Sequence, residues 1–413
     1  MITTAPTRLQ RGRLSQPVSF WALTVTLVVL LFASSAPSPL YIVYQSRWHF
    51  SAITLTSIFA VYVVALLVSL VFAGSLSDRV GRRPVLLIGL VVQTAAMVLF
   101  AVAHDVDVLF AARIVQGLAT GVATGALSAA LIDLQPHDRP HLGALLSSAA
   151  PPLGLAAGAL GSGLLVQYAP DPLRLVYWLL VAGFVLAIAA VVAIPETVTA
   201  QRGGWARVLR PRLGVPHEVR GTFLAVAPVL VATWALSGLY VSLGPSLAVS
   251  LLHTTSHVTG GLVIVALTAT GAATSVATRG HAPQPTMIFG AAMLVLGVAL
   301  TLGGLNDGTT ALFFAGSVVA GTGFGAGFSG AFKTLMTQAP ADGRAGLIAS
   351  VYVLSYLGFS LPAIAAGVAV THQGLLQTTN VYGVAVMALA LWAASVSLLR
   401  HRRAGATAVR ARA

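Results

Sequence analysis

Residues 74–84 read GSLSDRVGRRP and place one acid, Asp78, beside three arginines, Arg79, Arg82 and Arg83. Apolar runs flank this stretch on both sides, at 53–73 and 85–103. Charge is rare elsewhere, since 57% of the chain is hydrophobic and only 8% is charged. A charged loop between two apolar runs of this length predicts a turn between two membrane-spanning helices.

Composition indicates a helical protein that crosses the membrane many times. The mean hydropathy is +0.89, and apolar runs of about 20 residues recur along the whole chain. This composition excludes an ordinary soluble domain. The absence of cysteine excludes disulfides and thiolate metal sites. Lys333 is the only lysine among 23 basic residues, and this arginine bias is typical of a GC-rich bacterial genome.

Hydropathy and breaker residues predict twelve spans, each able to cross roughly 30 Å of hydrocarbon as a helix. The expected fold is all-α and integral to the membrane. The predicted spans are 18–44, 53–75, 84–103, 108–134, 141–168, 172–195, 222–250, 258–278, 285–304, 309–337, 345–371 and 377–399.

The arginines predict the orientation of these spans. With the N-terminus in the cytoplasm, only Arg47 and Arg174 fall on the outer side, and Arg113 falls within a span. All other basic residues then face the cytoplasm, as the positive-inside rule requires. We therefore expect a multi-pass protein of a bacterial plasma membrane with both termini cytoplasmic. The net charge of +13 reflects this topology, and no nucleic-acid partner is expected.

The two halves of the sequence also resemble each other, as if one unit had been duplicated. The longest polar, arginine-rich stretch follows the sixth span and predicts a six-helix bundle at 1–195, a cytoplasmic linker at 196–220 and a second bundle at 221–413. Weak echoes recur at an offset of about 200 residues, such as GLATG at 117–121 and GTGFG at 321–325. We expect two pseudo-symmetric halves related by an axis along the membrane normal.

Several motifs together resemble the major facilitator superfamily of transporters. Gly74, Leu76, Asp78, Arg79, Gly81, Arg82, Arg83 and Pro84 match its loop between spans two and three. RIVQGLATG at 113–121 resembles its span-four motif, and PET at 195–197 fits the end of span six. APPLGLAAGALG at 150–161 resembles the span-five motif of the drug:proton antiporter branch, although Ala150 replaces the usual glycine. The resemblance implies two-domain alternating access around a central cavity.

For the charged loop, the resemblance implies a conformational latch. Asp78 would face the positive N-terminal end of span eleven near Gly346, in the other half. Arg82 would pair with Asp133 at the cytoplasmic end of span four. The predicted latch residues are Gly74, Asp78, Arg79, Gly81, Arg82, Arg83 and Asp133. The alternative is a set of stop-transfer charges, and the matching second-half loop has Thr278 in place of the acid.

Span four contains an ionised residue, Arg113, in its outer third. Such a side chain is costly against lipid, so we expect Arg113 with Gln116 to serve in coupling or in binding a polar substrate group. The alternative is a snorkelling arginine bonded to the backbone and Gln116. The glycines and prolines of spans four and five are expected to allow close helix packing rather than to bind ligand. These residues are Gly117, Gly121, Pro151, Pro152, Gly154 and Gly158.

Proton coupling has no obvious site in the sequence. None of the ten acids falls at a membrane midplane, where drug antiporters usually have one. Asp133 is the acid on a span nearest the inner mouth of the cavity. It is expected to form the structural pair with Arg82, with a protonation role as the alternative.

A substrate cavity is predicted from aromatic and hydroxyl residues in spans one, seven, ten and eleven, with ordinary helix packing as the alternative. It suits neutral or anionic amphiphiles better than polycations. The candidate cavity residues are Ser38, Tyr41, Trp234, Ser237, Tyr240, Phe324, Phe328, Tyr352, Ser355 and Tyr356.

We therefore expect a secondary transporter, not an enzyme, that exports small hydrophobic or amphiphilic compounds by alternating access with protons. Its partners would be the lipid bilayer, a small-molecule substrate and protons, and it would act as a monomer without a cofactor or a metal. Uptake or facilitated diffusion of a neutral solute such as a sugar is the main alternative, and a transporter-like sensor is a further one.

Overall fold

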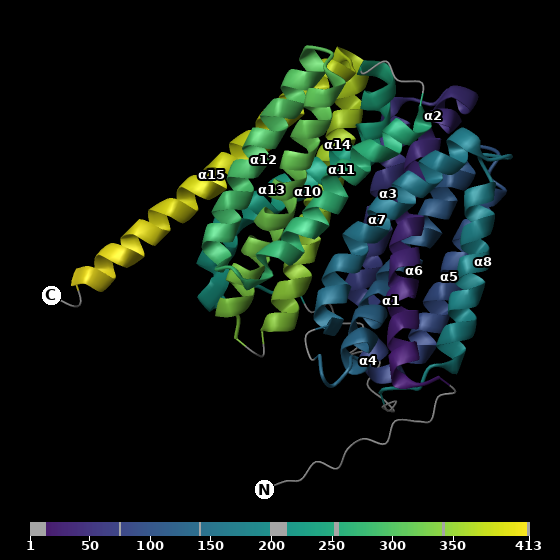
Figure 1. The fold of residues 1–413 in the computed structure, drawn as a ribbon, viewed down its shortest axis with the longest axis horizontal. Coiled ribbons are helices and arrows are strands. Elements are labelled where there is room, and N and C mark those ends of the chain that lie inside the picture. The colour runs from purple at the N-terminus through teal and green to yellow at the C-terminus, as the bar shows by residue number, and fades with distance from the viewer. Residues whose placement is uncertain are drawn as a thin grey trace, which may run out of the picture. The chain divides into compact units, whose positions relative to one another are not determined.

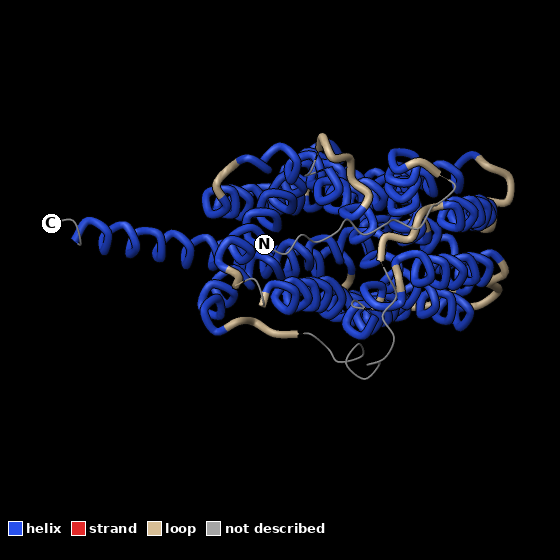
Figure 2. The backbone as a smooth tube through the Cα atoms, turned by 90° about the horizontal axis from the view of Figure 1, so that it is seen from below, coloured by secondary structure: helices blue, strands red, loops and turns tan. Residues whose placement is uncertain are grey.

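The structure is a computed structural model and describes residues 14–73, 76–139, 142–198, 213–251, 256–340 and 343–410. In these ranges it contains helices and no strand, as Figure 2 shows by its blue tubes. Twelve helical segments are long and apolar enough to cross a membrane, which confirms the predicted all-α membrane fold.

Within the described residues, the first half of the chain forms eight helical elements, because the first span divides and a short helix lies in the charged loop. Proline starts the second element, since its missing N–H interrupts the helical hydrogen bonds. The elements are α1 (Gln16–Ser35), α2 (Pro37–Trp48), α3 (Ala52–Ala73), α4 (Ser77–Val80), α5 (Arg82–Ala101), α6 (Val106–Asp133), α7 (Leu142–Tyr168) and α8 (Leu175–Ala193).

In its described part, the second half forms six long helices, labelled in Figure 1, and one short 3-10 turn. They are α10 (His217–Leu251), α11 (His257–Ala277), η1 (Thr278–Gly280), α12 (Pro283–Asn306), α13 (Thr310–Gln338), α14 (Arg344–Gln373) and α15 (Leu375–Arg410). The apolar part of α15 ends at Val396, and Figure 1 shows the rest of this helix extending beyond the other helices of its unit.

The chain divides into two compact units. Unit 1 comprises Met1–Leu31, Val64–Gly154 and Arg174–Pro211, and unit 2 comprises Phe32–Val63, Leu155–Leu173 and Arg212–Ala413. The boundaries cut through α1, α3 and α7, so one end of each helix belongs to each unit. The division at 195 and 221 between two six-helix halves remains a prediction.

In unit 1, α5 packs against both α6 and α8. A Cβ atom at Gly89 would lie 3.2 Å from the Cβ atom of Ala123, so α5 and α6 approach closely. Asp105 caps α6 by accepting the backbone N–H of Val108 at 2.9 Å, which satisfies one of the donors left free at a helix start.

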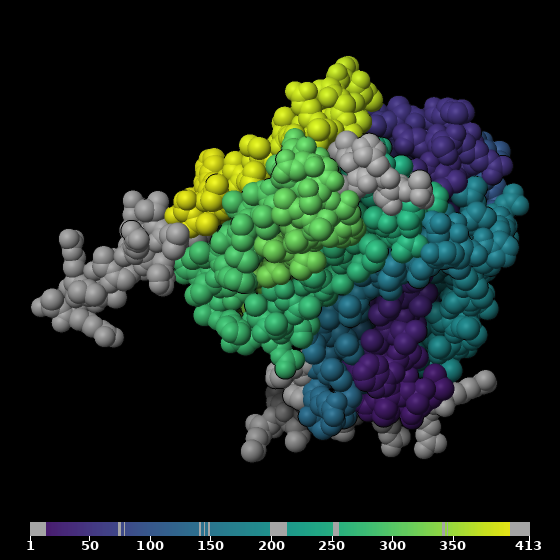
Figure 3. Space-filling view, turned by 45° about the horizontal axis from the view of Figure 1, so that its top comes forward, coloured from purple at the N-terminus to yellow at the C-terminus, as the bar shows by residue number. Residues whose placement is uncertain are grey.

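In unit 2, α12 and α13 pack along their whole length through glycines seven residues apart. The backbone of one helix lies where a Cβ atom of the other would be, which lets the axes approach closely. Figure 3 shows the resulting continuous green surface, with the yellow surface of α15 beside it. The facing pairs are Gly290 with Gly327, Gly297 with Ala320, Gly304 with Phe313, Gly316 with Thr301, Gly323 with Leu294 and Gly330 with Met287.

The α2 end of unit 2 joins segments from both halves of the sequence. Helix α2 packs on α10 and α11. A Cβ atom at Gly261 would lie 2.5 Å from the carbonyl oxygen of Ala159, and one at Gly163 would lie 3.4 Å from the Cα atom of Val258. Gly367 packs in the same way against Thr56. First-half segments therefore form part of the core of this unit.

Candidate functional site

The charged loop folds as α4 and a sharp turn into α5. Gly81 makes the turn with a φ of 109°, a conformation that L side chains rarely adopt. A Cβ atom at this position would also lie 2.7 Å from Oε2 of Glu196. Gly81 is therefore required both for the backbone conformation and for the approach of Glu196.

Glu196, which follows α8, caps the start of α5. Its Oε1 accepts the backbone N–H of Arg82 at 2.9 Å, and its Oε2 accepts that of Arg83 at 3.0 Å. Oε1 also accepts the backbone N–H groups of Thr197 and Val198 at 3.0 and 3.1 Å. A carboxylate at a helix N-terminus satisfies free donors and meets the positive end of the helix dipole. The PET motif at 195–197 contains this residue but does not by itself predict the cap.

Arg82 and Asp133 form the predicted ion pair. The Nε atom of Arg82 lies 3.2 Å from Oδ2 of Asp133, and the two side chains are 14% and 31% exposed. Arg82 also donates to Oγ of Ser77 at 2.7 Å, and the Thr197 hydroxyl donates to Oδ2 of Asp133 at 2.9 Å. We call Ser77, Arg82, Asp133, Glu196 and Thr197 the Glu196 network, which joins the starts or ends of α4, α5, α6 and α8.

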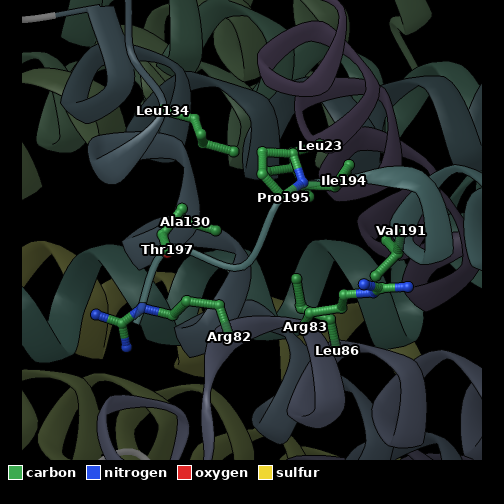
Figure 4. A pocket seen from close by; sticks show the side chains of 10 residues that line it. All are labelled: Leu23, Arg82, Arg83, Leu86, Ala130, Leu134, Val191, Ile194, Pro195 and Thr197. Carbon is green, nitrogen blue, oxygen red and sulfur yellow. The ribbon is translucent and has the colours of Figure 1, made fainter. Parts of the chain in front are cut away.

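A small pocket adjoins this network in unit 1. Figure 4 shows the Arg82 and Arg83 side chains pointing to opposite sides of it, and Arg83 donates to the carbonyl of Val192. Most of its lining is aliphatic, so it offers little to a polar ligand. The lining residues are Leu23, Arg82, Arg83, Leu86, Ala130, Leu134, Val191, Ile194, Pro195 and Thr197.

Two predicted latch positions are beyond what the structure describes. Gly74 lies outside the described residues, and Asp78 lies in α4 with its side chain outside the described part. Arg79 lies in the last turn of α4. The contact of Asp78 with the start of span eleven therefore stays a prediction.

Arg113 is fully buried within unit 1. Its guanidinium donates to Oε1 of Gln116 at 2.7 Å and lies 5.6 Å from the ring centre of Phe100. Phe100 in turn stacks on Tyr177, with ring centres 5.0 Å apart and planes 9° apart. A cation over an aromatic face is attracted to the ring, so α5, α6 and α8 together provide the surroundings of this charge.

Gln93 of α5 and Thr120 of α6 are two further buried polar residues of unit 1, and no sequence motif singled them out. Both are buried, and neither the amide atoms of Gln93 nor the hydroxyl of Thr120 has a hydrogen-bond partner in the described structure. Such groups are uncommon because an unpaired buried donor or acceptor is costly. These two residues stand out only because they are polar and buried, and burial cannot be read from the sequence alone.

The predicted packing residues of α6 and α7 lie at tight helix contacts or are buried. A Cβ atom at Gly121 would lie 2.6 Å from the carbonyl oxygen of Leu66. Gly158 faces the backbone of Phe32, near the Ser35 hydroxyl that donates to the carbonyl of Leu155 at 2.7 Å. Gly117 and Gly154 are buried, and Pro151 and Pro152 lie inside α7.

Aromatic residues of α10, α13 and α14 gather in unit 2 around Trp234. Trp234 contacts Tyr356 at 4.8 Å, Phe328 at 5.7 Å and Phe359 at 6.4 Å between ring centres, all edge to face. Phe332 links Phe328 to Tyr352, which lies beside Tyr356. We call these residues the Trp234 cluster: Trp234, Phe328, Phe332, Tyr352, Tyr356 and Phe359. All six are partly exposed.

Ser355 belongs to the same region. It lies three residues after Tyr352 and four before Phe359, and therefore on the same face of α14. Its side chain is fully buried, and its hydroxyl has no hydrogen-bond partner; the Trp234 indole N–H likewise has none.

The other predicted cavity residues lie apart from this cluster. Tyr240 is fully buried and bonds to Ser317 at 2.8 Å and to Thr301 at 3.3 Å, on the side of α10 that packs on α12 and α13. Phe324 packs against Gly271 of α11. Tyr41 lies edge to face with Phe59 at 5.0 Å. Ser38 and Ser237 are buried, and the Ser38 hydroxyl has no described partner.

Comparison with known proteins identifies the family of this chain. The sequence model of the Major Facilitator Superfamily matches residues 23–363. The chain belongs to the major facilitator superfamily. It is therefore a multi-pass membrane protein and a secondary transporter of small molecules, and this family consists of transporters rather than enzymes. Among the described residues, no three His, Asp or Glu side chains are placed to hold a metal ion.

Relatives of this superfamily member include multidrug resistance proteins. It is 26% identical over 310 residues to the multidrug resistance protein MdtL of Klebsiella pneumoniae (strain 342), covering 71% of this chain and 74% of that protein. A shorter match, 43% identical over 94 residues, is to the class C tetracycline resistance protein of Escherichia coli, covering 22% of this chain and 23% of that protein.

Solved structures share the fold of this superfamily member. A bacterial homologue of the human lysosomal transporter Spinster, in an inward-facing and unoccupied conformation, gives a TM-score of 0.74 at 12% identity. The match covers 92% of this chain and 97% of that one. Because the identity is low, this likeness supports the fold alone.

Proposed function

We propose that this transporter exports small hydrophobic or amphiphilic compounds across a bacterial plasma membrane by alternating access, coupled to protons. The Trp234 cluster carries this proposal. Its partly exposed rings come from three helices of one unit, and such surfaces bind flat apolar compounds through area and ring contacts. The relatives named for multidrug and tetracycline resistance support export as the direction.

In this proposal the Glu196 network holds the cytoplasmic ends of α5, α6 and α8 as one rigid block. Asp78 would then meet the start of α14 and hold the two halves together when the cavity opens outward. At the predicted outer end, opening would separate α7 from α11 and α3 from α14, which pack through Gly163, Gly261 and Gly367. Both termini would be cytoplasmic, and one chain would be sufficient for transport.

In this proposal, the residues that couple transport to protons lie in the first half of the chain. Asp133 accepts hydrogen bonds from Arg82 and Thr197, which favours a structural role for its carboxylate. Arg113, buried against Gln116 and Phe100, is the candidate for coupling or for contact with a polar substrate group. Facilitated diffusion of a neutral solute remains the second candidate, because the sequence places no acid at a membrane midplane.

The direction of transport is tested in cells that lack their own efflux pumps. Cells are preloaded with an uncharged fluorescent amphiphile, and its loss is followed after energy is supplied. Cells with the wild-type chain should lose the compound faster than cells with an equally expressed Arg113→Ala variant. Faster entry of the compound in unloaded wild-type cells, without faster loss, would favour uptake instead.

A further inference from the structure

Two polar groups at the Trp234 cluster, the Ser355 hydroxyl and the Trp234 indole N–H, lack described partners, although other serines on the same two helices have them. Within α14, the Ser360 hydroxyl donates to the carbonyl of Tyr356 at 2.9 Å. Within α10, the Ser242 hydroxyl donates to the carbonyl of Gly238 at 2.6 Å. Ser355 and the Trp234 indole N–H depart from this pattern, and a buried donor left unpaired is costly unless another state pairs it.

The two groups lie on neighbouring surfaces. A Cβ atom at Gly238 would contact the backbone of Phe359, and one at Gly358 would lie 3.2 Å from the Cα atom of Val231. Helices α10 and α14 are therefore in close contact along the stretch that contains Trp234 and Ser355. Ser355 therefore lies on the face of α14 that packs on α10, away from the exposed Leu357 and Leu361 of the same helix.

The charges of this unit oppose a cationic ligand. Helices α13 and α14 contain no acid, and the one acid of α10, Glu218, lies in its first turn. Asp171 lies between α7 and α8, Asp307 caps the end of α12, and Asp342 lies outside the described residues. A cation within the cluster would therefore meet rings and hydrogen-bond donors but no carboxylate. An uncharged ligand avoids the cost of bringing a charge to such a place.

We propose that the Trp234 cluster binds an uncharged, flat aromatic compound with a hydrogen-bond acceptor, which accepts from the Trp234 indole N–H and the Ser355 hydroxyl. This inference rests on the proposed transport function and names its substrate class. The rings of Phe328, Tyr352 and Tyr356 provide the apolar contact. The Trp234 N–H is covered in this structure, so a ring beside it, such as that of Tyr356, moves as the ligand enters.

Acridine and N-methylacridinium form a matched pair of probes for this proposal. They have the same ring system, but acridine is neutral in mild alkali and has a ring nitrogen that accepts a hydrogen bond. N-methylacridinium is a permanent cation and lacks that acceptor. Binding of each to the purified full-length chain in detergent is followed by probe fluorescence. We expect acridine to bind at least about tenfold more tightly, the ratio that one hydrogen bond of about 1.4 kcal/mol gives.

Matched variants isolate the two donors. Trp234→Phe removes the N–H and keeps a ring, and its control is Trp392→Phe, which changes a lipid-facing residue that is 65% exposed. Ser355→Ala removes the unpartnered hydroxyl, and its control is Ser360→Ala on the same helix. The ring nitrogen of acridine accepts one hydrogen bond, so at least one of the two cluster variants should weaken acridine binding about tenfold. Each control should leave it unchanged. Without ligand, the melting temperature of Ser355→Ala should not fall, because this variant loses only an unpaired buried hydroxyl.

Three outcomes separate this inference from the proposed function. Tighter binding of N-methylacridinium than of acridine would overturn it in favour of a cation site. Equal acridine binding by the wild type and both cluster variants would also overturn it, whether or not the chain exports other compounds. Loss of acridine binding in these variants, without energy-dependent efflux of acridine by the wild type, would support the binding site and contradict the export proposal.

Discussion

The carboxylate of Glu196 accepts the backbone N–H of Arg82, 114 residues earlier in the chain, at 2.9 Å. It therefore ties the segment after α8 to the first turn of α5. Arg82 is also the residue whose side chain pairs with Asp133. Arg82 thus takes part in both the helix cap and the ion pair. The charged loop is fixed to α6 by a side chain and to the segment after α8 by its backbone.

Replacing Glu196 should weaken both stability and transport. In Glu196→Ala, the N–H groups at the start of α5 lose a charged acceptor, and the free energy of unfolding should fall by about 2 kcal/mol. Thermal unfolding in detergent and vesicle transport measure the two effects. The control is Asp138→Asn, which removes an exposed carboxylate that is 77% accessible. Equal behaviour of both variants would show that the cap is unimportant.

Removing both partners of the pair between Arg82 and Asp133 should be less harmful than removing one. A single substitution leaves the other charge uncompensated in a partly buried place. Because the pair is partly exposed, we expect a coupling energy of about 0.5–1 kcal/mol from the variants Arg82→Ala, Asp133→Ala and the double variant. Unfolding of the three variants and the wild type gives this value.

The same residues distinguish a structural role from a proton site. If Asp133 bound the coupling proton, Asp133→Asn would abolish pH-driven accumulation but spare exchange down a substrate gradient. Additive losses in the cycle together with this selective defect would contradict the structural role.

The shape of Arg113 should matter as well as its charge. Lysine lacks the planar guanidinium that reaches Gln116 while it lies over Phe100. We expect Arg113→Lys to reduce transport roughly tenfold, a loss of about 1.4 kcal/mol, and Arg113→Ala to be nearly inactive. Arg174→Lys, at an exposed position at the start of α8, serves as the control. Normal transport by the alanine variant would leave Arg113 with a purely structural role.

Linking α7 to α11 at the predicted outer end should stop transport. The chain contains no cysteine, so Gly163→Cys and Val258→Cys can be introduced without background. Their backbones are close enough for a disulfide. The oxidised double variant should be inactive and a reductant should restore it, while each single variant stays active. Full activity of the oxidised, cross-linked protein would show that this contact does not open during transport.

The sequence predicted the features that depend on local pattern. Twelve apolar runs gave twelve spans, because hydropathy over a window of about 20 residues measures the requirement of a membrane helix directly. The proximity of Arg113 and Gln116 followed from their spacing of three residues on one helix. The glycines of α12 at positions 290, 297 and 304 recur every seven residues. This spacing is visible in the sequence and marks the face of α12 that packs on α13.

Contacts between distant segments were harder to predict. Tyr240 follows Trp234 by six residues, or about 240° around a helix, so it packs on α12 and α13 and not in the Trp234 cluster. The sequence prediction placed Trp234 and Tyr240 in one cavity because residue type alone does not show which face of a helix points toward which neighbour. Glu196 was not identified because its partners are backbone groups, which have no pattern in the sequence.

Transport by reconstituted vesicles with and without an imposed pH gradient tests the central claim most directly. Proton-coupled export predicts that an acidic interior drives accumulation of an uncharged amphiphile above its external concentration, and that a protonophore abolishes this accumulation. Arg113→Ala vesicles should not accumulate the compound under either condition. Equilibration to the same level with and without the gradient would contradict coupling and would identify the protein as a facilitator.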